Sequence, residues 1–209
     1  MNKNYVITIA RGFGSGGKQI AIELAKELGI PCYEKQILEL ASENSGINKA
    51  LFEEVDEKIK GSYITKCLME HPYLNVLEPT ERDFTSDINL FNIQAEIIRE
   101  LHKTKACVIV GKCADYILRG KKNVVSIYIE APRYACVESI IDKMHVSEKK
   151  AHELIKKTDK YRSDYYKYYT RGEDWTNPVN YHMVLNSEKV GRRECVEVIK
   201  NYVESKFSL

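Results

Sequence analysis

The chain has 209 residues, which suits a single domain with a sizeable core, and 30% of them are charged. Its formal net charge is only +2, so the charge balance does not support a nucleic-acid or membrane partner, which usually selects a basic excess. The six cysteines show no CxxC pair and no metal-ligand spacing, and no apolar run is long enough to span a bilayer. We therefore expect a reduced, cytoplasmic protein.

The first predicted element is a strand over Tyr5–Ala10. It is almost wholly apolar and rich in β-branched residues, as in a parallel sheet covered on both faces. A glycine cluster follows, and then a helix with an apolar stripe from Ile20 to Leu28. Gly29 is suited to end that helix, and residues 30–33 are predicted to form a second, short strand.

Residues 34–103 are polar and mostly helical, and we interpret them as an insertion within one domain. The residues that punctuate this stretch are Gly46, Gly61, Pro72 and Pro79. Residues 79–87 are predicted to form a loop, and Asp87 is placed to cap a helix from Ile88 to Lys103.

The second half alternates again between strands and helices. The predicted strands are Cys107–Val110, Val124–Ile129 and His182–Leu185. The helix after Pro132 is expected to bury Cys136, Ile140 and Met144, a further helix to start at Ser147, and the last helix to pack Val196, Ile199 and Val203. This alternation predicts an α/β fold with a parallel sheet and right-handed crossovers.

The glycine cluster Gly12–Lys18 fits the pattern GxxxxGK between a predicted strand and a predicted helix. Glycines let the backbone N–H groups converge on one point, and the helix N-terminus adds its positive dipole end there. A tight strand–helix turn is the alternative reading, but the coincidence of strand, glycines, lysine and helix favours phosphate binding. The residues expected to contact a triphosphate are Gly12, Gly14, Ser15, Gly16, Gly17, Lys18 and Gln19.

The position after the lysine departs from the usual phosphate-binding loop. A Ser or Thr hydroxyl normally helps to hold Mg²⁺ there, whereas this chain has Gln19 followed by Ile20. Magnesium must therefore be held by other groups, or the site is catalytically weakened. The sequence does not identify the metal ligands.

Four longer runs resemble the cytidylate kinase-like family. They are ITIARGFGSGGK at 7–18, GIPCYE at 29–34, VIVGKCADYIL at 108–118 and KKTDKYRSDYY at 156–166. The resemblance implies a three-layer sandwich of the nucleoside monophosphate kinase type with a five-stranded parallel sheet. It further implies a core of 1–33 and 104–209, an acceptor-binding helical insertion over 34–103 and a helical lid over about 147–172.

The same resemblance implies that ATP, with Mg²⁺, donates its γ-phosphoryl group to a nucleoside monophosphate such as CMP or dCMP. Two short motifs differ from those of the better-known cytidylate kinases. An Asp-Ser-Gly-type motif is replaced by Glu34-Lys35-Gln36-Ile37, and Asp-Gly-Arg-Asp is replaced by Val110-Gly111-Lys112-Cys113. Lysine keeps the charge of arginine but loses its planar, bidentate fork.

The predicted lid supplies the candidate catalytic cations, which are needed because phosphoryl transfer depends mainly on positioning and charge neutralisation. Arg162 is the first choice because it matches the basic lid position of the family, and Lys157 is the second. A solvated helix with interleaved charges is the alternative. The tyrosines between 161 and 169 are compatible with base stacking, with packing of the lid on the body, or with a contact between copies of the chain.

Candidate acceptor-binding residues follow the strands, because ligands of parallel sheets bind beyond the strand carboxyl ends. Glu34, Lys35 and Lys112 follow predicted strands, and Gln94, Arg99 and Asp159 on two predicted helices complete the set. Asp115 fits a helix-start carboxylate better than a metal ligand. Two functions remain open: a nucleoside monophosphate kinase or a kinase for a different small acceptor, and a nucleotide-binding module with little or no turnover.

Overall fold

The computed structural model of the chain describes residues 4–58 and 87–209. Its strands are β1 (Val6–Arg11), β2 (Cys32–Tyr33), β3 (Cys107–Val110), β4 (Val124–Glu130) and β5 (Met183–Asn186). Its helices are α1 (Gly17–Glu27), α2 (Gln36–Ser45), α3 (Lys49–Lys58), α5 (Asp87–Thr104), α6 (Ala114–Ile117), α7 (Arg133–Met144), α8 (Glu148–Tyr169), η1 (Pro178–Asn180), α9 (Ser187–Val190) and α10 (Arg192–Phe207). The predicted loop at 79–86 lies outside the described residues.

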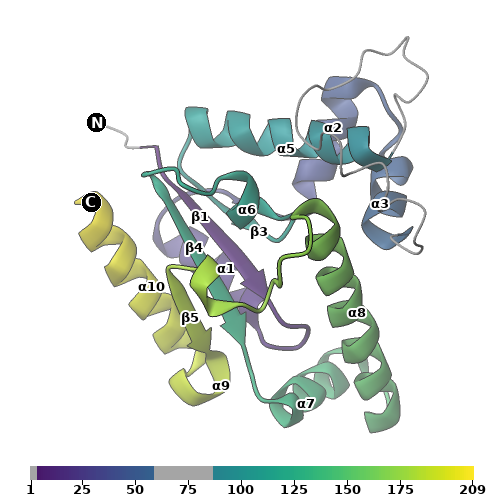
Figure 1. The fold of residues 1–209 in the computed structure, drawn as a ribbon. Coiled ribbons are helices and arrows are strands. Elements are labelled where there is room, and N and C mark those ends of the chain that lie inside the picture. The colour runs from purple at the N-terminus through teal and green to yellow at the C-terminus, as the bar shows by residue number, and fades with distance from the viewer. Residues whose placement is uncertain (1–3, 59–86) are drawn as a thin grey trace.

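The strands form one parallel five-stranded sheet in the order β2-β3-β1-β4-β5 (Figure 1). β1 lies at its centre, where Ile7 is in register with Val108 on one side and Val125 on the other. Ile7 and Ile9 are fully buried because helices cover both faces of this strand. The α/β class and the parallel sheet expected from the alternation of elements are confirmed.

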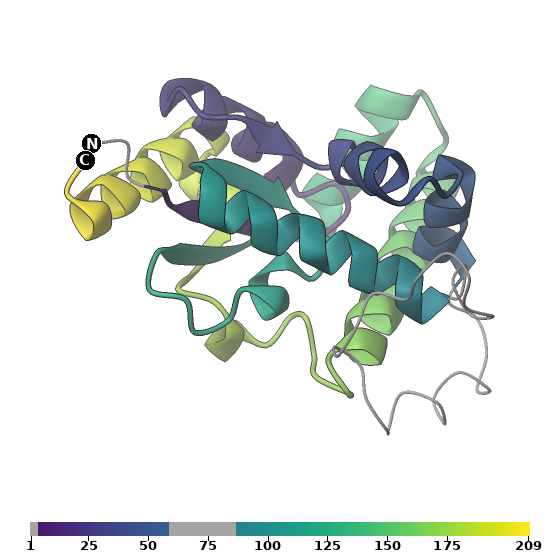
Figure 2. The ribbon, with the colours of Figure 1, turned by 90° about the horizontal axis from the view of Figure 1, so that it is seen from above.

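Helices on both faces of the sheet make three layers (Figure 2). α1 and α10 cover one face, where Leu24 and Ile199 join the same apolar cluster as Ile7. α5 and α6 cover the other face, where Ile98 joins the cluster of Val6. α8 crosses near the carboxyl end of β1, and its aromatic side chains form a third cluster with residues of α5 and β4 (Figure 1).

Local signals set several helix boundaries. Gly29, with φ +65°, follows the end of α1, as expected. The Ser147 side chain accepts a hydrogen bond from the N–H of Lys150 and so caps α8. The prediction that α7 buries Met144 is wrong, since this side chain is 45% exposed. α7 ends at Met144, one turn beyond Ile140, which is still buried.

The described part of the insertion over 34–103 shares its core with the sheet. Ile37 of α2 and Phe52 of α3 are fully buried and pack in the cluster that includes Ile98 of α5 and Val6 of β1. The division of the chain into one domain with an acceptor-binding insertion over 34–103 stays a prediction. Within the described ranges, no helix has both the length and the apolar character needed to cross a membrane.

Candidate functional site

The segment between β1 and α1 is a tight, glycine-dependent loop. Gly14 has φ +92°, and a Cβ there would lie 2.7 Å from the carbonyl oxygen of Cys136. A side chain at this position is therefore excluded by both conformation and space. α1 begins at Gly17, and the N–H groups of its first turn have no carbonyl partner within the helix. This geometry fits an anion such as a phosphate group.

Ser15 stabilises the loop from inside. Its hydroxyl donates to the Gly12 carbonyl at 2.9 Å and accepts from the Gly17 N–H at 3.4 Å, and the residue is only 1% exposed. The hydroxyl of Ser187, at the start of α9, donates to the Ser15 carbonyl at 2.5 Å. The Ser15 side chain thus shapes the loop, and its role in contacting a ligand stays a prediction.

Lys18, Glu34 and Arg11 form an ion-pair network at the carboxyl edge of the sheet. Lys18 Nζ lies 2.5 Å from Glu34 Oε2, and Arg11 Nη2 lies 3.1 Å from Glu34 Oε1. Burial alone would raise the pKa of Glu34, but the two cations outweigh it and lower that pKa below its usual value. Glu34 is therefore ionised at neutral pH. We did not predict Arg11 as a site residue, although a cation directly before the glycine loop is a usable signal.

α8 docks on the glycine loop through two predicted residues. Asp159 Oδ1 accepts a hydrogen bond from the Phe13 N–H at 2.8 Å. Arg162 Nη1 donates to the Arg11 carbonyl at 2.8 Å and lies 3.4 Å from Asp159 Oδ1. Its guanidinium also lies 5.6 Å from the centre of the Phe13 ring. Burial, and then the charge of Arg11, lower the pKa of Arg162 to about 10, so it remains a cation at neutral pH.

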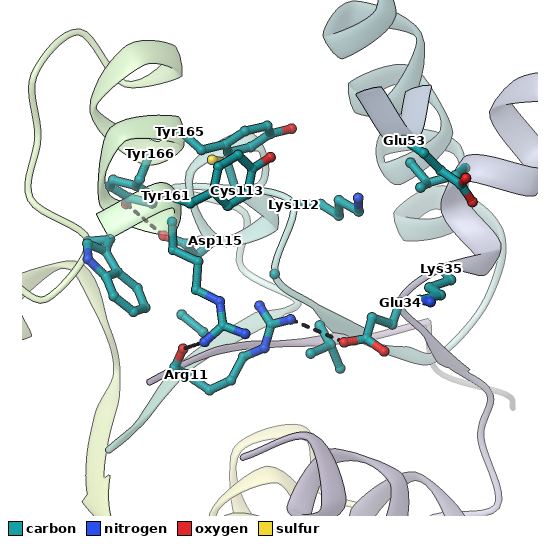
Figure 3. Close-up of a pocket in the computed structure, with 16 residues that line it drawn as sticks. Arg11, Glu34, Lys35, Glu53, Lys112, Cys113, Asp115, Tyr161, Tyr165 and Tyr166 are labelled. Atoms are coloured by element: carbon teal, nitrogen blue, oxygen red, sulfur yellow. Dashed lines mark hydrogen bonds and ion pairs between the residues drawn. The ribbon is translucent and has the colours of Figure 1, made fainter. Parts of the chain in front are cut away.

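A cavity of about 360 Å³ opens between α8, β3 and the start of α2. It is lined by Ala10, Arg11, Glu34, Lys35, Leu38, Glu53, Val110, Gly111, Lys112, Cys113, Asp115, Tyr161, Arg162, Tyr165, Tyr166 and Trp175. Figure 3 shows the labelled tyrosines on one side of this cavity, the carboxylates of Glu34 and Glu53 on the other, and Lys112 between them. The cavity therefore combines an aromatic wall with a charged wall.

Lys112 enters the cavity from an unusual turn after β3. Gly111, Lys112 and Cys113 have φ values of +74°, +59° and +52°, so three successive residues are left-handed. Such a run costs energy at each non-glycine residue, and strain of this kind clusters at ligand sites. Burial, and then the charge of Arg11, lower the pKa of Lys112 to about 7.

We expect Lys112→Met to raise the free energy of unfolding by about 1–3 kcal/mol below pH 7, because methionine fills similar space without a buried charge. The pKa of Lys112 is about 7 in the folded protein and near its ordinary 10.5 when unfolded. Between these values the unfolded chain binds more protons, so the stability of the parent rises with pH. The advantage of the variant should therefore shrink from pH 7 upwards. Thermal unfolding from pH 6 to 9 measures this, and a constant difference would contradict it.

Asp115 connects the turn after β3 to α8. It lies in the first turn of α6, as expected, and its Oδ2 accepts a hydrogen bond from the Tyr166 hydroxyl at 2.7 Å. Burial raises the pKa of Asp115 to about 6, although the bond from Tyr166 opposes that shift. This contact holds the aromatic face of α8 against the cavity floor.

The remaining predicted residues lie elsewhere. Gln94 is buried in α5, where its Nε2 donates weakly to the Leu90 carbonyl at 3.4 Å. Arg99 pairs with Glu96 on the same helix, and Lys157 is exposed on α8. None of these three predicted residues lines the cavity as far as the structure describes it. Gln19 is partly buried in α1, and its contact with a ligand stays a prediction.

Comparisons with known proteins agree with this architecture. A family model described as the cytidylate kinase-like family matches residues 6–189. An uncharacterised protein from Eubacterium ventriosum is 25% identical, with a TM-score of 0.70 over 96% of this chain and 99% of its own. A gluconokinase from Sinorhizobium meliloti is 12% identical, with a TM-score of 0.52 over 99% and 98% of the two chains, and shows the fold alone. No curated protein matches the chain.

Proposed function

This chain belongs to the cytidylate kinase-like family, and on that premise we propose that it transfers the γ-phosphoryl group of ATP to a nucleoside monophosphate, with CMP or dCMP as the acceptor. Family and fold support phosphoryl transfer in general. The observation that carries the proposal is the direct connection between the glycine loop and the cavity. Glu34 lines the cavity and also contacts Lys18 at the loop.

The glycine loop and the cations around it would bind ATP, the phosphoryl donor. The converging N–H groups at the start of α1 would bind the β- and γ-phosphates, and Lys18 would contact their oxygens. Arg162 lies beside the loop and would neutralise charge as the phosphoryl group moves. Its burial strengthens that effect, because a charge is screened less away from water.

The cavity suits an acceptor with a flat ring and an anionic group. Tyr161 and Tyr165 provide an aromatic face for a pyrimidine, while Arg11, and Lys112 in its protonated form, provide positive charge for a phosphate. The volume of about 360 Å³ is at the lower end of that of small-molecule sites, as expected for a single mononucleotide.

Magnesium would supply additional positive charge between the phosphates. Mg²⁺ keeps several waters and takes only one or two protein carboxylates, so a large acidic cluster is not required. Glu130 and Asp159 fit this demand. Asp159 binds the Phe13 N–H, and a Cβ on Gly12 would collide with the Glu130 carboxylate, so both carboxylates adjoin the loop. We propose that they hold the ion, in place of the hydroxyl that Gln19 lacks.

A coupled assay of ADP formation across the nucleoside monophosphates, with ATP and Mg²⁺, tests this proposal. We expect the highest kcat/KM with CMP or dCMP. ADP formed only with a non-nucleotide alcohol or acid would support kinase activity but contradict a nucleoside monophosphate as the acceptor. If no ADP forms with any acceptor at high enzyme concentration, the proposed kinase activity is contradicted.

A second candidate function is a nucleotide-binding module with little turnover. Gln19 in place of a hydroxyl and Val110 in place of an acidic residue favour it, because both changes remove common metal contacts. Calorimetry with a non-hydrolysable ATP analogue separates the candidates when it is compared with the assay. Tight binding without ADP formation supports the module, and no binding contradicts both functions.

A further inference from the structure

The two oxygens of the Glu34 carboxylate each contact a different cation. Oε2 contacts Lys18 at the start of α1, and Oε1 contacts Arg11 at the end of β1. Figure 3 shows Glu34 reaching across the lower edge of the cavity towards Arg11. A single side chain therefore connects the proposed donor lysine to the proposed acceptor cavity.

The contact with Lys18 competes with a triphosphate. Lys18 is 46% exposed and starts a helix, where a cation is disfavoured unless it meets negative charge. Here that charge comes from Glu34, which is ionised because the two cations keep its pKa low. A phosphate that binds Lys18 must either break the Lys18–Glu34 ion pair or bind next to the negative Glu34 carboxylate, which repels it. Either event subtracts from the binding free energy of the triphosphate.

Resting on the proposed function, we propose that Glu34 is a positioning residue that holds Lys18 in the nucleotide-free protein and releases it when the triphosphate binds. Arg11 keeps Oε1 in place, so the released Oε2 remains at the cavity edge. Binding of ATP thus frees a carboxylate oxygen at the cavity where the phosphoryl acceptor would bind. A hydroxyl or amino group of the phosphoryl acceptor could then donate a hydrogen bond to this oxygen only after ATP has bound.

The predicted signature is a variant that binds the donor more tightly than the parent. Glu34→Gln keeps the shape and one acceptor oxygen but removes the charge that competes for Lys18. The variant loses both a competing, partly exposed ion pair and the repulsion beside the phosphates, so the affinity for the donor should rise about three- to tenfold. A purely structural role for Glu34 would produce the opposite change, because loosening the site weakens binding.

Calorimetry with the non-hydrolysable analogue AMPPNP tests this, with Mg²⁺ and again with EDTA. We expect tighter binding by Glu34→Gln in both conditions. The matched control is Glu100→Gln, which removes a carboxylate paired with Lys103 at 2.6 Å on the exposed end of α5. This control should bind AMPPNP as the parent does.

Unchanged or weaker binding by folded Glu34→Gln would overturn the inference, and weakening only with Mg²⁺ would assign Glu34 to the metal instead. If Glu34→Gln fails to fold, Glu34→Asp provides the same test. Its shorter side chain retains the charge beside Arg11 but withdraws from Lys18, so affinity should again rise. Failure of the parent itself to bind AMPPNP contradicts the proposed function and is distinguishable from either result.

Discussion

Lys18→Ala should reduce the affinity for AMPPNP at least tenfold and lower turnover about 10²–10³-fold, as loss of a preorganised phosphate-binding group does. The side chain is half exposed and pairs with Glu34 at the edge of the cavity. In the donor complex its ammonium would instead meet the phosphate oxygens at the start of α1. The effect should therefore be the largest of any single change in the loop.

The fold should survive this substitution. A partly exposed ion pair contributes at most about 1 kcal/mol to stability, so the melting temperature should fall by only a few degrees. Calorimetry and thermal unfolding measure the two effects separately. Lys26→Ala, which removes an exposed lysine from the last turn of the same helix, is the matched control for net charge. A Lys18→Ala protein that binds AMPPNP like the parent would refute phosphate binding by this loop.

Arg162→Ala should lower kcat about 10³-fold while changing the KM for ATP much less. An arginine that stabilises charge in a transferring phosphoryl group can contribute a factor of this size. Contacts formed only in the transition state appear in kcat, whereas uniform binding appears in KM. Arg162 is mostly buried beside the loop, held by the Arg11 carbonyl and Asp159, so the charge is already positioned where transfer would occur.

Steady-state kinetics on the purified variant, with the acceptor identified by the coupled assay, measure this effect. Lys160→Ala is the matched control, since Lys160 lies on the same helix but is exposed and paired with Asp164. Arg162→Lys adds a second comparison, because lysine retains the charge but loses the planar fork that holds two acceptors. Unchanged kcat in folded Arg162→Ala would remove it from the catalytic residues and leave Lys157 as the next candidate.

The glycine loop and the central strands were predictable because their signals are local. Adjacent β-branched residues predict β1, and the glycines next to Lys18 predict a loop that no bulkier residues could form. The start of α8 at Ser147 was equally predictable, because a capping side chain bonds to a backbone group three residues away. Such interactions involve neighbours in the chain, so the amino-acid order specifies them without knowledge of the packing.

The pairing of charges across the site could not be predicted in this way. Asp159 meets the Phe13 N–H although 146 residues separate them, and Arg162 meets the Arg11 carbonyl across 151 residues. Contacts like these depend on the sheet order, which brings the ends of β1, β2 and β3 to one edge, and on the angle at which α8 crosses it.

The same reason explains why some candidates lie in the cavity and others do not. Lys112 enters the cavity because a left-handed turn follows β3, whereas Gln94, on the helix that leads into this strand, is buried in α5. From their positions in the sequence, both Lys112 and Gln94 were predicted to lie near the phosphoryl acceptor. The orientation of a side chain on a packed helix, however, depends on which face of the helix contacts its neighbours. That face is determined only when elements distant in the sequence bury their apolar surfaces against one another.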